Sequence, residues 1–278
     1  MLSLFKRYRM ARTPNQHVHP FTFMTLCERV KPMSQVEFEF AQQSLEFSSD
    51  WLYQHQANGC YSDAGHMVVQ NKNAAGFQDS LYQHLAARSL PVVLSNCHET
   101  LLNALPVMAL DDQEIGLINI GHRFDLKQTL DLQLGSVFHF ALTRYSNTRL
   151  FCLGIDESLQ ANQVVEYAED LGVNWLTLSE CSFRFRNNLK AQLASYIEHC
   201  DQLIISIDLA SLVSTMGVDE NHALDNQMVL RTLRQCVLSG KVKLIQLVGA
   251  KDKLIYSRQT KEIFDELFAL SPEITHVA

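Results

Sequence analysis

The distribution of apolar and polar positions along the second half of the chain predicts a series of buried strands. Six apolar runs of strand length, rich in branched aliphatic residues, lie at residues 90–96, 114–121, 149–155, 173–178, 202–209 and 241–249. None of the runs alternates cleanly with polar residues. This pattern is typical of strands in a parallel sheet, because helices cover both faces of such a sheet.

Helical segments lie between several of these runs. Residues 161–172, 188–199 and 225–240 carry apolar positions at helical spacing, and the first and third of them end at a glycine. Residues 35–58 and 78–88 are also interpreted as helical, and the polar, glycine-containing stretch 60–76 as a loop. The alternation predicts an α/β fold with three αβα layers and a doubly wound, mostly parallel sheet.

Composition restricts the classes of protein that fit this pattern. The chain has 278 residues, of which 47% are hydrophobic and 19% charged, and this suits a globular protein with one large or two small domains. The net charge of −7 argues against a nucleic-acid-binding protein, which usually has a basic face. No apolar run approaches the roughly 18–20 residues that cross a bilayer, so we expect no membrane partner.

The cysteines and the N-terminus point to a cytoplasmic location. The seven cysteines are odd in number and widely spaced, which fits neither a disulfide framework nor a structural zinc site. Residues 1–20 carry four basic side chains with no apolar segment after them, so they are interpreted as a basic arm and not as a secretory signal. The expected domain spans residues 21–278.

Polar side chains at the ends of the predicted strands are the candidates for a site. In open α/β sheets, ligands bind outside the carboxyl ends of the strands. His98 and Glu99, Asp125, Asp208 and Gln246 follow or end four of the runs. Imidazole and carboxylate groups are ligands for ions such as Mn²⁺. Each of these residues also has an ordinary structural interpretation, as a hydrogen-bonded histidine or a helix cap.

Five short motifs in the same region resemble those of a known enzyme family. They read SNCHE at 95–99, NIGHRFDLK at 119–127, GSVF at 135–138, SIDLA at 206–210 and QLVGAKD at 246–252. In this order they resemble, in degraded form, the signatures of the ureohydrolases, which include arginase, agmatinase and formimidoylglutamase. The resemblance covers about residues 90–270 and is closest to the formimidoylglutamase branch.

The resemblance implies an arginase-like fold and a specific chemistry. Members of the family hydrolyse C–N bonds of linear amidines with a hydroxide that bridges two manganese ions, which supply the nucleophile at neutral pH. They commonly assemble as trimers or hexamers, so we expect a homo-oligomer. Residues 1–90 depart most from the family and are expected either to form a different interface or to cover the site.

The metal ligands that the resemblance implies are only half present. Three of the six positions keep a ligating residue: His98, Asp125 and Asp208. The other three hold Gly121, Arg123 and Ala210, and Gln246 stands in place of the glutamate that grips the cationic end of the substrate in the family. One metal position is therefore expected to be lost, so the chain has either no manganese or a single ion.

Arg123 raises the question of what replaces the lost metal ion. Carboxylates buried without compensation are costly, and a guanidinium group is always charged and matches a carboxylate fork. We therefore expect Arg123 to take the place of the metal ion and to pair with Asp208, with Asp125 as a second partner. Side chains alternate along a strand, so His122 is expected to face away from positions 121, 123 and 125.

Three hypotheses about function follow. In the first, the chain is a pseudoenzyme that has lost binuclear hydrolysis and retains a binding role, with a small-molecule ligand at the strand ends. In the second, His98, Asp125 and Asp208 hold one metal ion in an active hydrolase of a formimino or guanidino compound, with Glu99 or His139 as the base. In the third, the chain is a structural subunit of an oligomer.

Overall fold

The computed structural model of the protein describes residues 19–55, 61–69, 73–109, 113–213, 223–249 and 251–273, so the predicted N-terminal arm lies almost wholly outside the described residues. The strands in this part of the chain are β1 (Phe21–Glu28), β2 (Tyr61–Val69), β3 (Leu90–Ser95), β4 (Ile115–Ile120), β5 (Thr148–Ile155), β6 (Asn174–Thr177), β7 (Gln202–Asp208) and β8 (Val242–Val248). The six predicted strands are confirmed as β3 to β8.

All the strands belong to one eight-stranded sheet in the order β2-β1-β3-β8-β7-β4-β5-β6. Every neighbouring pair is parallel, so the carboxyl ends of all the strands lie at one edge of the sheet. The strands β8 and β7 separate β3 from β4, although β3 and β4 are consecutive in the chain. The residues that follow β3, β4, β7 and β8 therefore come together at the centre of this edge.

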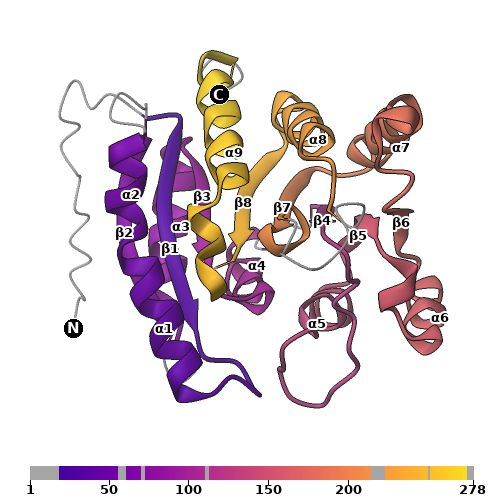
Figure 1. Ribbon diagram of the computed structural model, residues 1–278, viewed down its shortest axis with the longest axis horizontal. Coiled ribbons are helices and arrows are strands. Elements are labelled where there is room, and N and C mark those ends of the chain that lie inside the picture. Colours follow the sequence, from indigo (N-terminus) through magenta and orange to yellow (C-terminus); the bar gives the residue numbers. More distant parts are fainter. Residues whose placement is uncertain are drawn as a thin grey trace, which may run out of the picture.

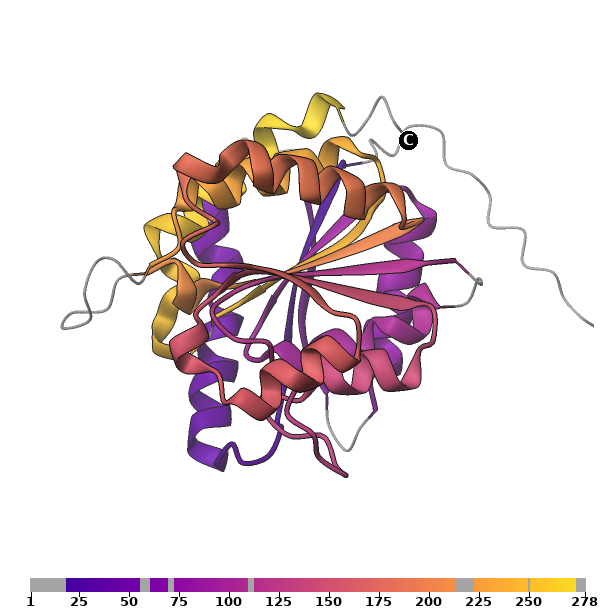
Figure 2. The same ribbon diagram turned by 90° about the vertical axis from the view of Figure 1, so that its right-hand side faces the viewer.

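Helices cover both faces of the sheet, as the sequence predicts. The α-helices are α1 (Gln35–Glu46), α2 (Ser48–His55), α3 (Ala75–Ala86), α4 (Leu105–Met108), α5 (Val137–Arg144), α6 (Asn162–Asp170), α7 (Arg186–Glu198), α8 (Asn226–Leu238) and α9 (Arg258–Ala269). Figure 2 shows the sheet between two layers of helices. The helices α1, α2, α7, α8 and α9 share one apolar core with the sheet, and α3 to α6 share the other.

Alternation along the strands distributes side chains between these two cores. In β4, Ile118 and Ile120 belong to the core under α1, α7, α8 and α9, and Ile115 and Leu117 belong to the opposite one. Each of these four side chains is at most 1% exposed. A strand that is buried on both faces reads as a continuous apolar run, which explains why β3 to β8 are predictable from the sequence.

The first part of the sheet corrects one prediction and adds a strand. The interpretation of residues 60–76 as a loop is wrong, because Tyr61–Val69 form the edge strand β2. Its neighbour β1 is not among the predicted strands. Along β2 the side chains are mostly half-buried, so the apolar signal of a buried strand is missing, and the pairing with β1 fixes its conformation instead. The predicted helix over residues 35–58 divides at Phe47 into α1 and α2.

No helix among the described residues is long and apolar enough to cross a membrane.

Candidate functional site

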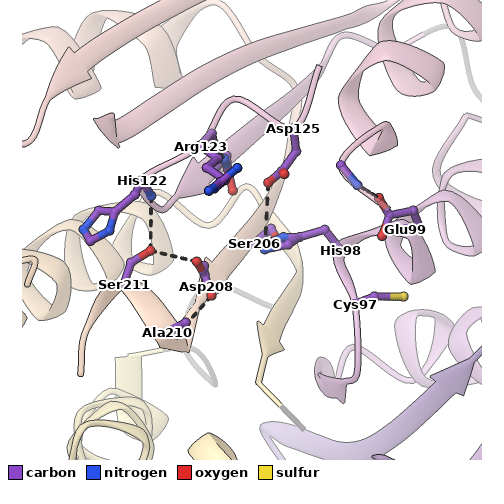
Figure 3. A network of polar contacts seen from close by, with 12 residues as sticks. Cys97, His98, Glu99, His122, Arg123, Asp125, Ser206, Asp208, Ala210 and Ser211 are labelled. Carbon is purple, nitrogen blue, oxygen red and sulfur yellow. Dashed lines mark hydrogen bonds and ion pairs between the residues drawn. The ribbon is translucent and has the colours of Figure 1, made fainter. Parts of the chain in front are cut away.

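The candidate residues meet at the carboxyl edge of the sheet. His98 begins the short 3-10 helix η1 (His98–Asn103) after β3, Asp125 follows β4, and Asp208 ends β7. Figure 3 shows the three side chains near one another in two groups of contacts, one with His98 and Asp125 and the other with Asp208. The structure therefore brings the three residues from separate strands to the same edge of the sheet.

A chain of hydrogen bonds starts at His98. Its Nδ1 lies 3.0 Å from Ser206 Oγ, and Ser206 donates its hydroxyl hydrogen to Gln246 Oε1 at 3.3 Å. Because the Ser206 hydroxyl is already used as a donor, its oxygen accepts from His98, which places the imidazole hydrogen on Nδ1. His98 Nε2 therefore faces Asp125, with its nitrogen 4.0 Å from Asp125 Oδ2.

Gln246 is the centre of this network and is 1% exposed. Its Nε2 lies 2.9 Å from Ser95 Oγ, 3.2 Å from the Cys97 carbonyl oxygen and 2.6 Å from Thr100 Oγ1. The side chain thus joins β8 to β3 and η1, and through Ser206 to β7. Buried amides are favourable when their donors and acceptors are satisfied. Gln246, which the resemblance matches to a substrate-binding glutamate, therefore connects strands within the protein.

Asp125 has an unusual backbone and an unfavourable electrostatic environment. Its φ of +49° lies in the left-handed region, which Asn and Asp tolerate better than other side chains. The pKa of its carboxyl group is raised from 3.8 to about 6, mainly by burial; His98 opposes the shift, the charges of Glu99 and Asp208 add to it, and Arg123 has the smallest effect, which lowers the pKa. The negative charge of Asp125 is therefore poorly compensated.

Asp208 is used as a helix cap. Its Oδ1 accepts a hydrogen bond from Ala210 N at 3.0 Å, at the start of the 3-10 helix η4 (Leu209–Ser211). Its Oδ2 accepts from Ser211 Oγ at 2.8 Å, and Ser211 Oγ accepts from His122 N at 3.1 Å. Both carboxylate oxygens thus have protein donors, as the alternative interpretation of an aspartate at a strand end predicts.

Gly121 lies directly against Asp208. A Cβ atom at Gly121 would be 3.1 Å from Asp208 Cβ and 3.6 Å from Ser211 Oγ. A carboxylate side chain at this position, as the resemblance implies for the family, would therefore require Asp208 to shift by a few tenths of an ångström. The present position of Asp208 is matched to a glycine at position 121.

These residues do not fit the two-manganese centre that the family resemblance implies. Among the described residues, no three His, Cys, Asp or Glu side chains form a group that could hold a metal ion. Gly121 and Ala210 have no ligating atoms, and Asp208 is held by Ala210 and Ser211. His98 and Asp125 are the two candidate ligands that face each other. We therefore derive no catalytic step through a metal ion.

The prediction that Arg123 forms an ion pair with Asp208 or Asp125 is wrong. Arg123 is exposed, and no ion pair among the described residues joins it to Asp125 or Asp208. In Figure 3 no dashed line reaches its guanidinium group. The extended strand ends at Ile120, and the chain then bends toward the left-handed Asp125, so strand geometry does not place position 123. Arg123 acts on Asp125 only as the weakest of the causes that shift its pKa.

His122 turns away from the candidate ligands, as expected, but for a different reason. Figure 3 shows its ring pointing away from Asp125 and Asp208. Because His122 lies beyond the end of β4, alternation along the strand does not determine the direction of its ring. The backbone conformation of His122 is fixed by two hydrogen bonds to its carbonyl oxygen, from Asp156 N at 3.1 Å and from Gln160 Nε2 at 2.7 Å.

Neither candidate base lies in a position that suits the role. Glu99 is 2% exposed, and its Oε1 accepts from Gly135 N at 2.7 Å and Ser136 N at 3.2 Å. It therefore secures the backbone that leads into α5. His139 lies on α5, where its Nδ1 is 2.8 Å from Tyr167 OH, and burial followed by the charge of Arg144 lowers its pKa.

We expect Glu99→Ala to lower the free energy of unfolding by about 1 kcal/mol. The substitution leaves two backbone N–H groups without an acceptor, which costs about 1–3 kcal/mol, while removal of a negative charge near Asp125 offsets part of the loss. Glu99→Gln keeps an oxygen acceptor and should be close to the wild type. Urea unfolding of both variants measures the difference; equal destabilisation of the two would show that the charge, and not the two hydrogen bonds, matters.

Ser206 and Ser211 are hydrogen-bond partners of the candidate residues that the sequence analysis does not single out. Both lie in the segment SIDLAS, next to Asp208, and that proximity was the available signal. Ser206, His98 and Asp125 have the residue types of a nucleophilic triad. However, Ser206 is 1% exposed and donates its hydrogen to Gln246, so it cannot reach a substrate.

Solved arginases and formimidoylglutamases have the same fold as this chain. The chain superimposes on formimidoylglutamase from Bacillus subtilis with a TM-score of 0.66 at 15% identity, covering 92% of this chain and 87% of the other. For a manganese-bound variant of Trypanosoma cruzi formiminoglutamase the TM-score is 0.70 at 15% identity, with coverage of 94% and 96%. For Helicobacter pylori arginase it is 0.63 at 12% identity, with coverage of 88% and 98%. The protein therefore has an arginase-like α/β fold.

Sequence similarity leads to the same enzymes, although no protein-family model matches the chain. It is 27% identical to formimidoylglutamase from Chromobacterium violaceum over 200 residues, which are 67% of this chain and 65% of the relative. It is 22% identical to the enzyme from Staphylococcus carnosus over 207 residues, 72% of this chain and 65% of the relative. The chain thus spans just under two thirds of these relatives. Fold and sequence together confirm the resemblance to the ureohydrolases, and the degraded metal positions agree with the absence of a metal-binding group among the described residues.

Proposed function

We propose that this protein is a formimidoylglutamase-like pseudoenzyme, which keeps the ureohydrolase fold and has lost binuclear manganese hydrolysis of C–N bonds. The observation that carries the proposal is the state of Asp208. Both of its oxygens accept hydrogen bonds from the protein, and a carboxylate side chain at position 121 would require Asp208 to shift. These contacts support the loss of the second metal position.

The burial of Gln246 supports the same proposal. An amide carries no negative charge to attract an amidinium group. The amide nitrogen of Gln246 is already hydrogen-bonded to Ser95, Cys97 and Thr100. A small molecule that binds at the strand ends would therefore be recognised by other groups. The retained role is binding or the support of a partner.

The alternative is a hydrolase with one metal ion at His98, Asp125 and Asp208. The mutual approach of His98 and Asp125 favours it, because Nε2 of the imidazole and Oδ2 of the carboxylate face the same space. Against it stands the capping role of Asp208, whose oxygens would have to leave Ala210 and Ser211 to bind an ion.

The deciding measurement is the metal content of the protein after exposure to excess Mn²⁺ and dialysis. We expect near zero ions per chain by mass spectrometry, and no release of ammonia or formamide from N-formimino-L-glutamate, nor of urea from guanidino substrates. One ion per chain would favour the mononuclear alternative. Two ions per chain would overturn the proposal.

A variant designed to restore ligands provides the positive control. Arg123 and Ala210 are both exposed, so the double substitution Arg123→His with Ala210→Asp fits without rearrangement of the core. We expect it to bind Mn²⁺ more tightly than the wild type in the same titration. Addition of Gly121→Asp should reduce stability, since its Cβ would meet Asp208. Failure of the double variant to gain affinity would mean that positions 123 and 210 do not face the lost metal site.

A further inference from the structure

A cluster of phenylalanine and arginine side chains lies exposed where β6 passes into α7. Phe183 and Phe185, in the 3-10 helix η3 (Phe183–Phe185), are 51% and 38% exposed. The guanidinium carbon of Arg186 lies 4.3 Å from the centre of the Phe183 ring, and that of Arg231, from α8, lies 5.3 Å from it. Arg184 lies 5.4 Å from the Phe185 ring. We call these five residues the arginine–phenylalanine surface.

The arginines of this surface are available to bind an acidic group. Stacking on a ring orders the guanidinium group and leaves N–H donors free at its edge. No ion pair among the described residues includes Arg184, Arg186 or Arg231. The sequence from residue 181 to residue 197 contains no Asp or Glu. On a chain with a net charge of −7, this is a local excess of positive charge next to exposed apolar rings.

The helix α1 has a surface of opposite charge that is also apolar. Val36, Phe40 and Phe47 are 59%, 68% and 57% exposed. Their spacings of four and seven residues place them on one side of the helix. Residues 35–55 contain four acidic residues (Glu37, Glu39, Glu46 and Asp50) and no Lys or Arg. We call Val36, Phe40 and Phe47, together with Glu39 and Glu46, the α1 face.

The carboxylates of the α1 face have few positive partners. Glu39 accepts from Gln35 Nε2 at 2.8 Å and Glu46 from Gln42 Nε2 at 3.0 Å, and both donors are neutral amides. His66 Nε2 lies 4.0 Å from Glu46, but burial lowers the pKa of this imidazole, so it does not supply a positive charge at neutral pH. The negative charge of the face is therefore still available to a partner.

The two surfaces lie at opposite ends of the sheet. The helix α1 packs over β1, next to the edge strand β2, and η3 follows the other edge strand β6. Figure 1 shows α1 and α7 at opposite sides of the molecule. The surfaces cannot meet within one chain, but they match each other in charge and both carry exposed phenylalanine rings. Such a pair fits the contact between two copies.

We propose that the chain assembles head to tail, with the α1 face of one copy on the arginine–phenylalanine surface of the next. A contact between two different surfaces is heterologous, so it forms a ring if the rotation closes and a filament if it does not. The inference concerns assembly and does not rest on the loss of catalysis. It gives the homo-oligomer expected from the sequence a specific interface.

The test uses one variant on each surface, with sedimentation velocity as the measurement. The full-length wild type should be oligomeric at about 50 μM, and Phe40→Asp and Phe183→Asp should each be monomeric, since loss of one buried aromatic anchor weakens such contacts roughly 30-fold or more. Each variant keeps one intact surface. An equimolar mixture should therefore form dimers and nothing larger. This result is specific to a head-to-tail contact.

Controls separate this interface from a general loss of solubility or fold. Tyr82 on α3 is 58% exposed and belongs to neither surface, so Tyr82→Asp should assemble like the wild type. Circular dichroism should show the same fold for all three variants, because the substituted side chains are exposed. Arg184→Glu with Arg186→Glu should dissociate the assembly, and Glu39→Arg with Glu46→Arg in a second chain should restore pairing with it.

A monomeric wild type at this concentration would overturn the proposal. So would a mixture of the two aspartate variants that remains monomeric, because it would show that the surfaces do not bind each other. An assembly that survives Phe40→Asp would place the contact elsewhere on the chain. Higher salt should weaken the assembly of the wild type and of the complementary mixtures, since part of the attraction is between exposed charges.

Discussion

Gln246→Glu is expected to destabilise the protein by about 4 kcal/mol at neutral pH, although it introduces the residue that the family resemblance implies for this position. The carboxylate would be buried without a positive partner, which costs about 3–5 kcal/mol. It would also face the Cys97 carbonyl oxygen, to which Gln246 now donates a hydrogen bond. The hydroxyl groups of Ser95 and Thr100 already donate to that same carbonyl oxygen. To donate to the new carboxylate, they would have to give up these hydrogen bonds.

Urea unfolding at two pH values measures this effect. At pH 5 the introduced carboxyl group is protonated and can donate, so much of the loss should be recovered. Gln246→Met provides the matched control: it keeps the shape, adds no charge and should cost about 1 kcal/mol at either pH. If Gln246→Glu unfolded like the wild type at neutral pH, the network around position 246 would have to be open to water or to a cation.

Asp125→Asn should stabilise the protein, in contrast to Gln246→Glu, and raise the free energy of unfolding by about 2 kcal/mol at pH 7. The pKa of this carboxyl group is raised from 3.8 to about 6 in the folded state, so ionisation opposes folding. A shift of this size corresponds to about 3 kcal/mol at most. Asparagine tolerates the left-handed φ of +49° and introduces no strain.

The pH dependence checks the cause. Between pH 4 and 6 the folded wild type binds more protons at Asp125 than the unfolded chain, so this group makes stability fall as the pH rises, and the penalty is complete above pH 6. Asp125→Asn removes that slope, and the two proteins should converge near pH 4. Asp125→Ala tests the backbone separately, because alanine is strained at positive φ and should gain less than asparagine. If the Asp125→Asn variant were less stable than the wild type at pH 7, the negative charge of Asp125 would have to be well compensated in the folded protein, contrary to the prediction.

A strand can be predicted from the sequence when burial on both faces makes it aliphatic, and is harder to predict when it contains buried polar residues. Runs such as Leu90–Ser95 are aliphatic because both faces are buried, and the sequence shows this directly. In β1 the apolar run is interrupted by Thr22, Thr25 and Glu28. All three are buried in the structure, where Thr22 contacts Ser62 and Ser89, Thr25 contacts His66 and Glu28 accepts from Asn103. Such partners lie far along the chain and cannot be read from local pattern.

The same limit applies to the candidate site. The expected parallel arrangement of the strands and the residue types were enough to select His98, Asp125 and Asp208 as residues of one edge. They were not enough to place Arg123, because its direction depends on where β4 ends and on the backbone of Asp125. The donors that hold Asp208 come from Ala210 and Ser211, and one of these is a backbone group that any residue would supply.

The hydrogen-bond network around Gln246 has a consequence for the life of the protein in the cell. In metalloproteins, metal binding can contribute to folding, so the amount of folded protein depends on the metal supply. Here neutral amide and hydroxyl groups join β3, β7 and β8. If the protein binds no manganese, as we propose, its abundance is independent of how much manganese the cell can acquire.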